Sequence, residues 1–165
     1  MSRTDTPAEF SQKFVAGSVP QTMEGFYRGE LTHTFPRTIP ESLGSLLLKG
    51  WLPWLGKCWY PQVQMGDNIL PFYLQRLFLM KYGEIYDFRA GFGGFHALPF
   101  SLSVQPGLAD PIQVMRLSYN LEQNPAIVRS VVDELVDAGN NTYLGKAYVI
   151  KDNTPRLVAC FTLFK

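Results

Sequence analysis

The chain has 165 residues, of which 46% are hydrophobic, 18% are charged and 14% are aromatic, and its formal net charge is +1. This length suits a single domain spanning 1–165, and the wealth of apolar and aromatic residues excludes a disordered chain. The near-neutral charge without a basic run excludes the electrostatic surface of a nucleic-acid-binding protein. The first residues form no signal peptide, and no apolar run is long enough to span a membrane, so we expect a cytoplasmic protein.

Residues 1–22 predict a helix and a lead-in to the main fold. In TPAEFSQKFVAG, Thr6 is a suitable N-cap, Pro7 fits the first turn and Glu9 completes a capping box. Gly17 is placed to end the helix. A helix of about ten residues is therefore expected near the N-terminus.

The first expected strand, GFYRGELTH, begins with two glycines that bracket an aromatic residue and a cation. Glycine within a strand marks a bend, a bulge or a close backbone approach. We expect Gly25 and Gly29 to let this strand bend where it closes a barrel. Tyr27 would then point inward and close the barrel floor.

Two segments between 36 and 82 are less regular. The sequence predicts a second short helix at 40–50, opened by proline and stopped by glycine. The overlapping stretch 43–60 concentrates three tryptophans among leucines, which predicts a plug or portal lid for the barrel. Transient contact with a membrane is the alternative. The segment 69–82 fits either strands or a short helix.

Most of the remainder has the alternation and composition of strands. The expected strands are 25–33, 56–60, 84–90, 98–104, 111–121, 127–136, 142–150 and 156–164. Short turns join several of them in sequence order, which predicts an antiparallel β-barrel of about eight strands with one or two short N-terminal helices. A barrel of this size can hold one small ligand.

The run Gly25–Gly29 resembles the G-x-W-x-G motif that names the GXWXG-domain family of uncharacterised bacterial proteins, with Tyr27 at the tryptophan position. WLGK at 54–57 resembles the W-x-G-K element that follows in that family, and VVDEL, NTYLGKAY and FTLFK are similar to its C-terminal part. The family is similar in organisation to lipocalin-like (calycin) proteins. In a lipocalin-like barrel an aromatic residue of the first strand seals the floor against a cation from a late strand, and the resemblance implies this role for Tyr27, with Arg156 or Lys165 as its partner. The resemblance covers 23–165 and implies a lipocalin-like barrel with a small apolar ligand, but it implies no catalytic residue.

If the apolar faces of these strands point inward, eight side chains become candidates for binding the ligand: Tyr27, His33, Trp54, Tyr86, Met115, Tyr119, Ser130 and Glu134. Glu134 alternates with Val132 and Val136, and a carboxyl group among apolar side chains has the raised pKa that a general acid or base needs. Glu134 and Tyr119 are therefore the candidate catalytic pair. The alternative is that Glu134 lies near a strand end, paired with an arginine.

Neither a metal nor a cofactor is expected. His33 and His96 are distant in sequence and have no companion cysteine cluster. Cys58 and Cys160 lie far apart, which favours two buried free thiols over a disulfide. The chain has no G-x-S-x-G motif, and the glycine-rich stretch 90–94 lacks the lysine of a phosphate loop, so we expect a loop there.

The predicted function is to bind or carry a small hydrophobic molecule, such as a lipid, an isoprenoid or a polyketide-like compound, as a monomer or a homodimer. One alternative is a barrel enzyme, an isomerase or cyclase that acts on such a molecule by acid–base catalysis. Another is a tryptophan-rich protein-interaction module. An enzyme should show polar groups that converge at one depth of the barrel, a carrier should show scattered ones, and an interaction module should expose a tryptophan patch.

Overall fold

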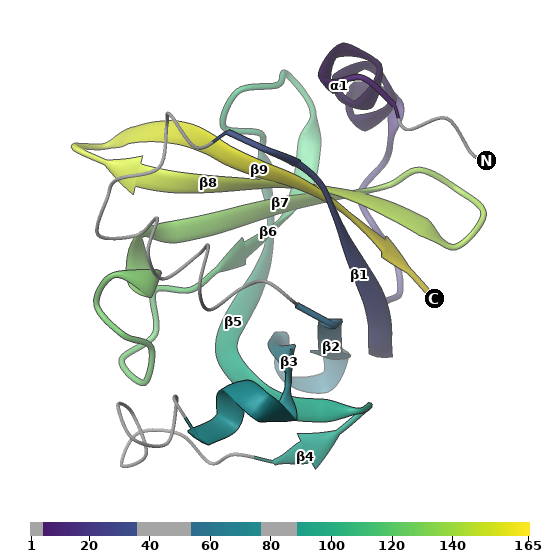
Figure 1. Ribbon diagram of the computed structural model, residues 1–165. Coiled ribbons are helices and arrows are strands. Elements are labelled where there is room, and N and C mark those ends of the chain that lie inside the picture. The colour runs from purple at the N-terminus through teal and green to yellow at the C-terminus, as the bar shows by residue number, and fades with distance from the viewer. Residues whose placement is uncertain (1–4, 36–53, 77–88) are drawn as a thin grey trace.

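The computed structural model describes residues 5–35, 54–76 and 89–165. These ranges form a mainly β structure in which a helix precedes a closed antiparallel barrel of eight strands (Figure 1). The barrel strands are β1 (Gly25–Thr34), β2 (Gly56–Tyr60), β3 (Met65–Pro71), β5 (Gly94–Pro106), β6 (Gln113–Ser118), β7 (Val131–Asp137), β8 (Thr142–Lys151) and β9 (Thr154–Phe164). The predicted fold is confirmed.

The chain runs up and down around the barrel in sequence order. Each barrel strand pairs with the next one along the chain, and β9 closes the ring against β1. The short strand β4 (Ala90–Gly91) pairs with β5 alone and lies outside the ring. Such closure leaves the barrel strands without free edges over the paired residues.

Helix α1 (Pro7–Ala16) lies outside the ring of strands (Figure 1). The predicted capping box is present, because the hydroxyl of Thr6 and the carboxylate of Glu9 each accept the other residue's backbone N–H. Phe10 and Phe14 lie on one face of the helix and pack against an outer core on the barrel wall. The other buried members of this outer core are Val114, Val136, Leu144 and Cys160.

A larger core lines the inside of the barrel. Its buried residues come from the inward faces of the strands and the loops between them, and they include Tyr27, Trp59, Phe100 and Tyr119. Alternation along β7 assigns Val131 and Leu135 to this inner core and Val136 to the outer core. The barrel wall therefore separates two packed layers, one inside and one beneath α1.

The two glycines of β1 have different structural roles. Gly25 has a φ of 73°, a backbone conformation that favours glycine, whereas Gly29 lies outside that region. A Cβ at Gly29 would fall 2.3 Å from the ring of Trp54, so this glycine allows a close approach and not the expected bend. Tyr27 is buried, and the ammonium of Lys165 lies 4.5 Å from its ring centroid, which confirms the predicted aromatic–cation contact.

The main differences from the sequence expectations concern β7 and β3. The expected strand 127–136 begins with a 3-10 helix, η3 (Val128–Ser130), so β7 starts later. Strand β3 was not expected. The ambiguous segment 69–82 supplies the end of β3 and a helical turn at 72–76, and its remainder lies outside the described residues. The expected helix at 40–50 and most of the expected strand at 84–90 also lie outside them.

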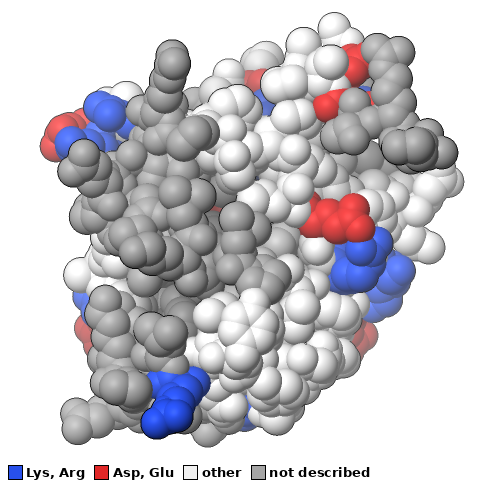
Figure 2. All heavy atoms as spheres, viewed as in Figure 1, with Lys and Arg blue, Asp and Glu red and all other residues white. Residues whose placement is uncertain are grey.

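The described part of the surface carries few charges on the face shown in Figure 2, where acidic and basic groups lie next to each other. Both cysteines are buried and free, as expected. Among the described residues, no helix has the length and apolar character needed to cross a membrane.

Candidate functional site

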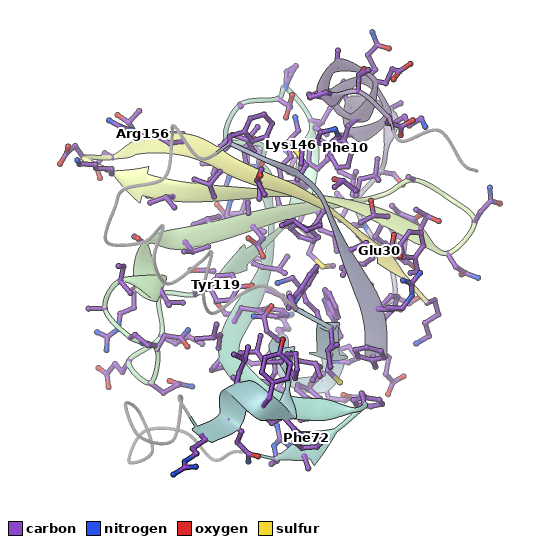
Figure 3. The ribbon with its side chains drawn as sticks, viewed as in Figure 1. Phe10, Glu30, Phe72, Tyr119, Lys146 and Arg156 are labelled. Carbon is purple, nitrogen blue, oxygen red and sulfur yellow. The ribbon has the colours of Figure 1, made fainter. Side chains whose placement is uncertain are left out.

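Four polar side chains meet inside the barrel. Lys57 comes from β2, Asn68 from β3, Asp133 from β7, and Tyr119 follows the last residue of β6. Their exposed fractions are 2%, 3%, 1% and 0%, respectively. We call these four residues the inner polar cluster, of which Tyr119 is labelled in Figure 3.

Lys57 is the centre of the inner polar cluster. Its Nζ lies 2.9 Å from Asn68 Oδ1 and 2.9 Å from Asp133 Oδ2, and it also donates to the hydroxyl of Tyr119. An ammonium group has three N–H donors and no acceptor. Each of the three donors of Lys57 therefore has its own acceptor.

The other donors of this network are also used. The Tyr119 hydroxyl donates to Asp133 Oδ2 at 2.9 Å. Asn68 Nδ2 donates to the Leu98 carbonyl at 2.9 Å and to the Tyr119 hydroxyl at 3.1 Å. The indole N–H of Trp54 donates to Asn68 Oδ1 at 3.1 Å. One oxygen is left over, because Asp133 Oδ1 is buried and has no hydrogen-bond partner among the described residues.

Aromatic rings surround the ammonium of Lys57. Its Nζ lies 4.9 Å from the ring centroid of Phe100, 5.2 Å from Tyr119, 5.3 Å from Trp54 and 5.4 Å from Phe161. These distances allow cation–π attraction that offsets part of the cost of burying the charge. The polar cluster is thus set in an apolar, aromatic wall.

Burial shifts the pKa values of Lys57 and Tyr119. The loss of hydration lowers the pKa of Lys57, and the nearby Asp133 carboxylate opposes that change. Burial, followed by the charge of Asp133, raises the pKa of Tyr119 well above its ordinary value. Tyr119 consequently keeps its proton at neutral pH and acts as a hydrogen-bond donor.

A second aromatic group lies beside the cluster. Trp59 packs edge-on against Phe100, with ring centroids 5.6 Å apart, and against Tyr27 at 5.3 Å. The Trp59 ring is 1% exposed, and its indole Nε1 has no hydrogen-bond partner among the described residues. The two described tryptophans of the 43–60 stretch, Trp54 and Trp59, therefore face the barrel interior and form no exposed patch.

Four of the eight predicted binding residues belong to the inner core or pack against it: Tyr27, Trp54, Met115 and Tyr119. His33 does not, because its Nε2 lies 3.0 Å from the Asp5 carbonyl and its ring contacts Phe10 of α1. Ser130 donates to the Ile127 carbonyl within the turn of η3. Tyr86 lies outside the described residues. Contact of the inward set with a ligand stays a prediction.

Glu134 was expected inside the barrel, and this expectation is wrong. Its Oε1 accepts the Leu108 backbone N–H at 2.6 Å and lies 3.4 Å from Arg116 Nη2, on the outer side of the wall. The error comes from η3: Val128 and Val131 both enter the inner core three residues apart, so the two-residue alternation restarts at Val131. Burial does raise the pKa of Glu134, as the sequence predicted.

Sequence reasoning did not place Lys57, Asn68 or Asp133 among the binding residues. The available signal was a lysine and a carboxylate inside apolar strands, since Lys57 is the second residue of GKCWY and Asp133 alternates with Val131 and Leu135. A charged residue in such a pattern is ordinarily assigned to the solvent face. The convergence of these three residues requires the closed barrel.

Another set of polar contacts, separate from the inner polar cluster, lies on the outer side of β2, β3 and β5. Asp67 Oδ2 lies 3.2 Å from His96 Nδ1 and 3.0 Å from Arg89 Nη2, and it accepts the Tyr60 hydroxyl at 3.1 Å. Within the described ranges, no group of three or more histidine, cysteine, aspartate or glutamate side chains is arranged to hold a metal ion.

Comparisons with known proteins add one observation. No family model matches the chain, and no curated protein matches it. A solved structure, described as the crystal structure of a protein from Thermomonospora curvata, is similar with a TM-score of 0.55 and 12% sequence identity. The match covers 98% of this chain and 88% of that chain. The two chains share a fold. At this identity the likeness concerns the fold alone.

Proposed function

We propose that the protein binds a small, mainly apolar molecule inside its barrel and orients it through one polar group at the inner polar cluster. The observation that carries this proposal is the convergence of Lys57, Asn68, Tyr119 and Asp133 within an aromatic interior. Small-molecule sites are typically apolar with a few placed polar groups. An interior that served packing alone would gain little from such charges, because apolar residues in place of a buried ion pair are often neutral or stabilising.

The side chains around the cluster support the same conclusion. Several inward positions carry small residues, which fill less of the barrel than leucine or phenylalanine would: Ala97, Val131, Ala147, Val149, Val158 and Ala159. Among the described residues, four partly exposed side chains pack against the inner core: Trp54, Leu102, Met115 and Ile127. Trp54 therefore links the surface to the polar cluster.

Tryptophan fluorescence tests this function, because Trp54 and Trp59 both face the interior. Titration with 12-carbon and 15-carbon apolar probes, such as 1-dodecanol and farnesol, is expected to change the emission saturably, and native mass spectrometry should show one bound molecule. Asn68→Leu should weaken binding at least tenfold by breaking the network, whereas the exposed Lys151→Ala serves as a control that binds normally. If no probe gives saturable binding, the proposal is wrong.

The same convergence favours a second candidate, an acid–base isomerase in which Asp133 takes the role first assigned to Glu134. The Asp133 carboxylate would take a proton from a carbon next to a carbonyl group and return it to another carbon, so that one C–H bond breaks, another forms and a double bond moves. An unsaturated ketone incubated in heavy water should then exchange hydrogen. Asp133→Asn should slow that exchange by about two to four orders of magnitude. If the ketone binds but no hydrogen exchanges, the protein is a carrier and not an isomerase.

A further inference from the structure

We propose that the molecule bound in the barrel carries a hydroxyl group that donates to Asp133, and that the site therefore prefers apolar alcohols to apolar carboxylic acids. This inference rests on the proposed binding function and specifies the chemistry of its ligand. It follows from a count of the donors and acceptors in the barrel interior.

The donors of the inner polar cluster are already engaged. All three donors of Lys57 have acceptors, and both N–H groups of the Asn68 amide are bonded. The Tyr119 hydroxyl donates to Asp133, and the Trp54 indole donates to Asn68. A ligand carbonyl or carboxylate would have to displace one of these bonds to be held here.

The unused atom is an acceptor. Asp133 Oδ1 has no partner among the described residues, although its companion Oδ2 lies 2.9 Å from both Lys57 Nζ and the Tyr119 hydroxyl. Asp133 forms an ion pair with Lys57, and a carboxylate can only accept hydrogen bonds. An unsatisfied buried oxygen raises the free energy of the protein, and a ligand O–H would satisfy it with a strong charge-assisted bond.

The charges of the cluster disfavour an acid. The ammonium of Lys57 and the carboxylate of Asp133 offset each other, so a second carboxylate would enter an apolar interior without a counter-charge. The other unpartnered inward polar atom among the described residues, Trp59 Nε1, is a neutral donor. It can donate to the oxygen of a hydroxyl group, but it cannot neutralise an acid.

A matched pair of probes tests the inference. The affinities of 1-dodecanol and dodecanoic acid, which share a chain length, are measured at pH 7.5 by tryptophan fluorescence and calorimetry. The wild-type protein should bind the alcohol at least tenfold more tightly. In Asp133→Asn the preference should fall below threefold or invert, because Lys57 then keeps an uncompensated positive charge. Glu134→Gln, on the opposite face of the same strand, should keep the wild-type preference.

A second measurement uses the wild-type protein alone and remains informative if Asp133→Asn does not fold. Lowering the pH from 8 towards 5 protonates part of the fatty acid, since an ordinary carboxyl group has a pKa of about 4–5. The neutral acid carries an O–H donor, so its affinity should approach that of the alcohol.

The outcomes separate this inference from the proposed function. Equal affinity for the acid and the alcohol at pH 7.5, or an unchanged preference in folded Asp133→Asn, would overturn the inference while binding itself stands. If neither probe binds, the interior network is structural, and both the function and the inference fail.

Discussion

Adjacent residues of β7, Asp133 and Glu134, place two carboxyl groups on opposite sides of one barrel wall. Both are buried, both lie near a cation, and each has one oxygen without a partner among the described residues. Asp133 meets Lys57, which belongs to the distant strand β2, whereas Glu134 lies directly across from Arg116 on the neighbouring strand β6. The inner contact depends on the closed barrel, and the outer one depends on a single strand pairing.

The charged groups on the two sides of the wall also differ in their access to water. The side chains of Lys57 and Asp133 are 3% and 2% exposed, whereas that of Arg116 on the outer side is 18% exposed. A charge that loses its partner inside the barrel stays dehydrated, whereas Arg116 on the outer side can regain water, although the side chain of Glu134 itself is 0% exposed. Similar ion pairs should therefore contribute differently to stability on the two sides of the wall.

The largest effect is expected for Lys57→Met. Removal of the ammonium leaves the buried Asp133 carboxylate without its counter-charge, which should lower the free energy of unfolding by about 3–5 kcal/mol. The double variant Lys57→Met with Asp133→Leu removes both charges and should recover most of that loss. Guanidinium chloride unfolding measures both variants. A single variant as stable as the wild type would contradict the assigned ion pair.

The outer side offers a matched pair in Lys146 and Asp110, whose Nζ and Oδ2 lie 2.7 Å apart. Lys146 lies beneath α1, near Phe10 in Figure 3, and its ammonium is 4.5 Å from the ring of Phe14. Lys146→Met should cost about 1.5–3 kcal/mol, because the partly exposed Asp110 can regain water. A loss as large as that of Lys57→Met would remove the distinction between the two sides.

Gly29→Ala tests the packing that holds Trp54 over the inner polar cluster. The new Cβ would fall 2.3 Å from the Trp54 ring, so the ring must move, and such overpacking should cost about 1–3 kcal/mol. The fluorescence of the protein should shift as well. Thr34→Ala, at an exposed position of the same strand, is the control for thermal unfolding. Equal melting temperatures for both variants would show that the Trp54 ring does not constrain Gly29.

The smallest effect is expected for Glu134→Gln, and it depends on pH. Burial raises the pKa of Glu134 above its ordinary value of 4.5, so between that value and the raised pKa the folded state holds more protons than the unfolded state. The free energy of unfolding should therefore fall as the pH rises through this window. Glu134→Gln should flatten that fall and leave the protein at least as stable at pH 7. Unfolding curves from pH 4 to 7 measure this pH dependence, with the exposed Glu122→Gln as control. If the free energy of unfolding changes with pH equally in the wild type and in Glu134→Gln, the carboxyl group lies in solvent.

The sequence predicts the barrel well, because its signals are local. Capping at Thr6 and Glu9 defines α1, and GKCWY has the same bounds as β2. Inward placement of Tyr27 and Tyr119 also follows from alternation within single strands. These features need only a few consecutive residues.

The inner polar cluster could not be predicted in the same way. One turn of 3-10 helix before β7 changes the alternation and exchanges the sides of Asp133 and Glu134. Lys57 contacts partners that lie far along the chain and that meet it only through barrel closure. The sequence did allow the contact of Glu134 with an arginine to be predicted as an alternative, because Arg116 lies on the neighbouring strand of a predicted hairpin.

The pairing of β1 with β9 also has a consequence for biosynthesis. Arg28 of β1 pairs with Phe164 of β9. One edge of β1, the first barrel strand to be synthesised, can therefore form its hydrogen bonds only after β9 has been made. While the ribosome synthesises the intervening strands, β1 presents unpaired backbone groups that invite association with other chains. Closure of the barrel is thus a late step governed by long-range contacts, which fold slowly. We expect nascent chains that stop before β9 to be the species most dependent on chaperones.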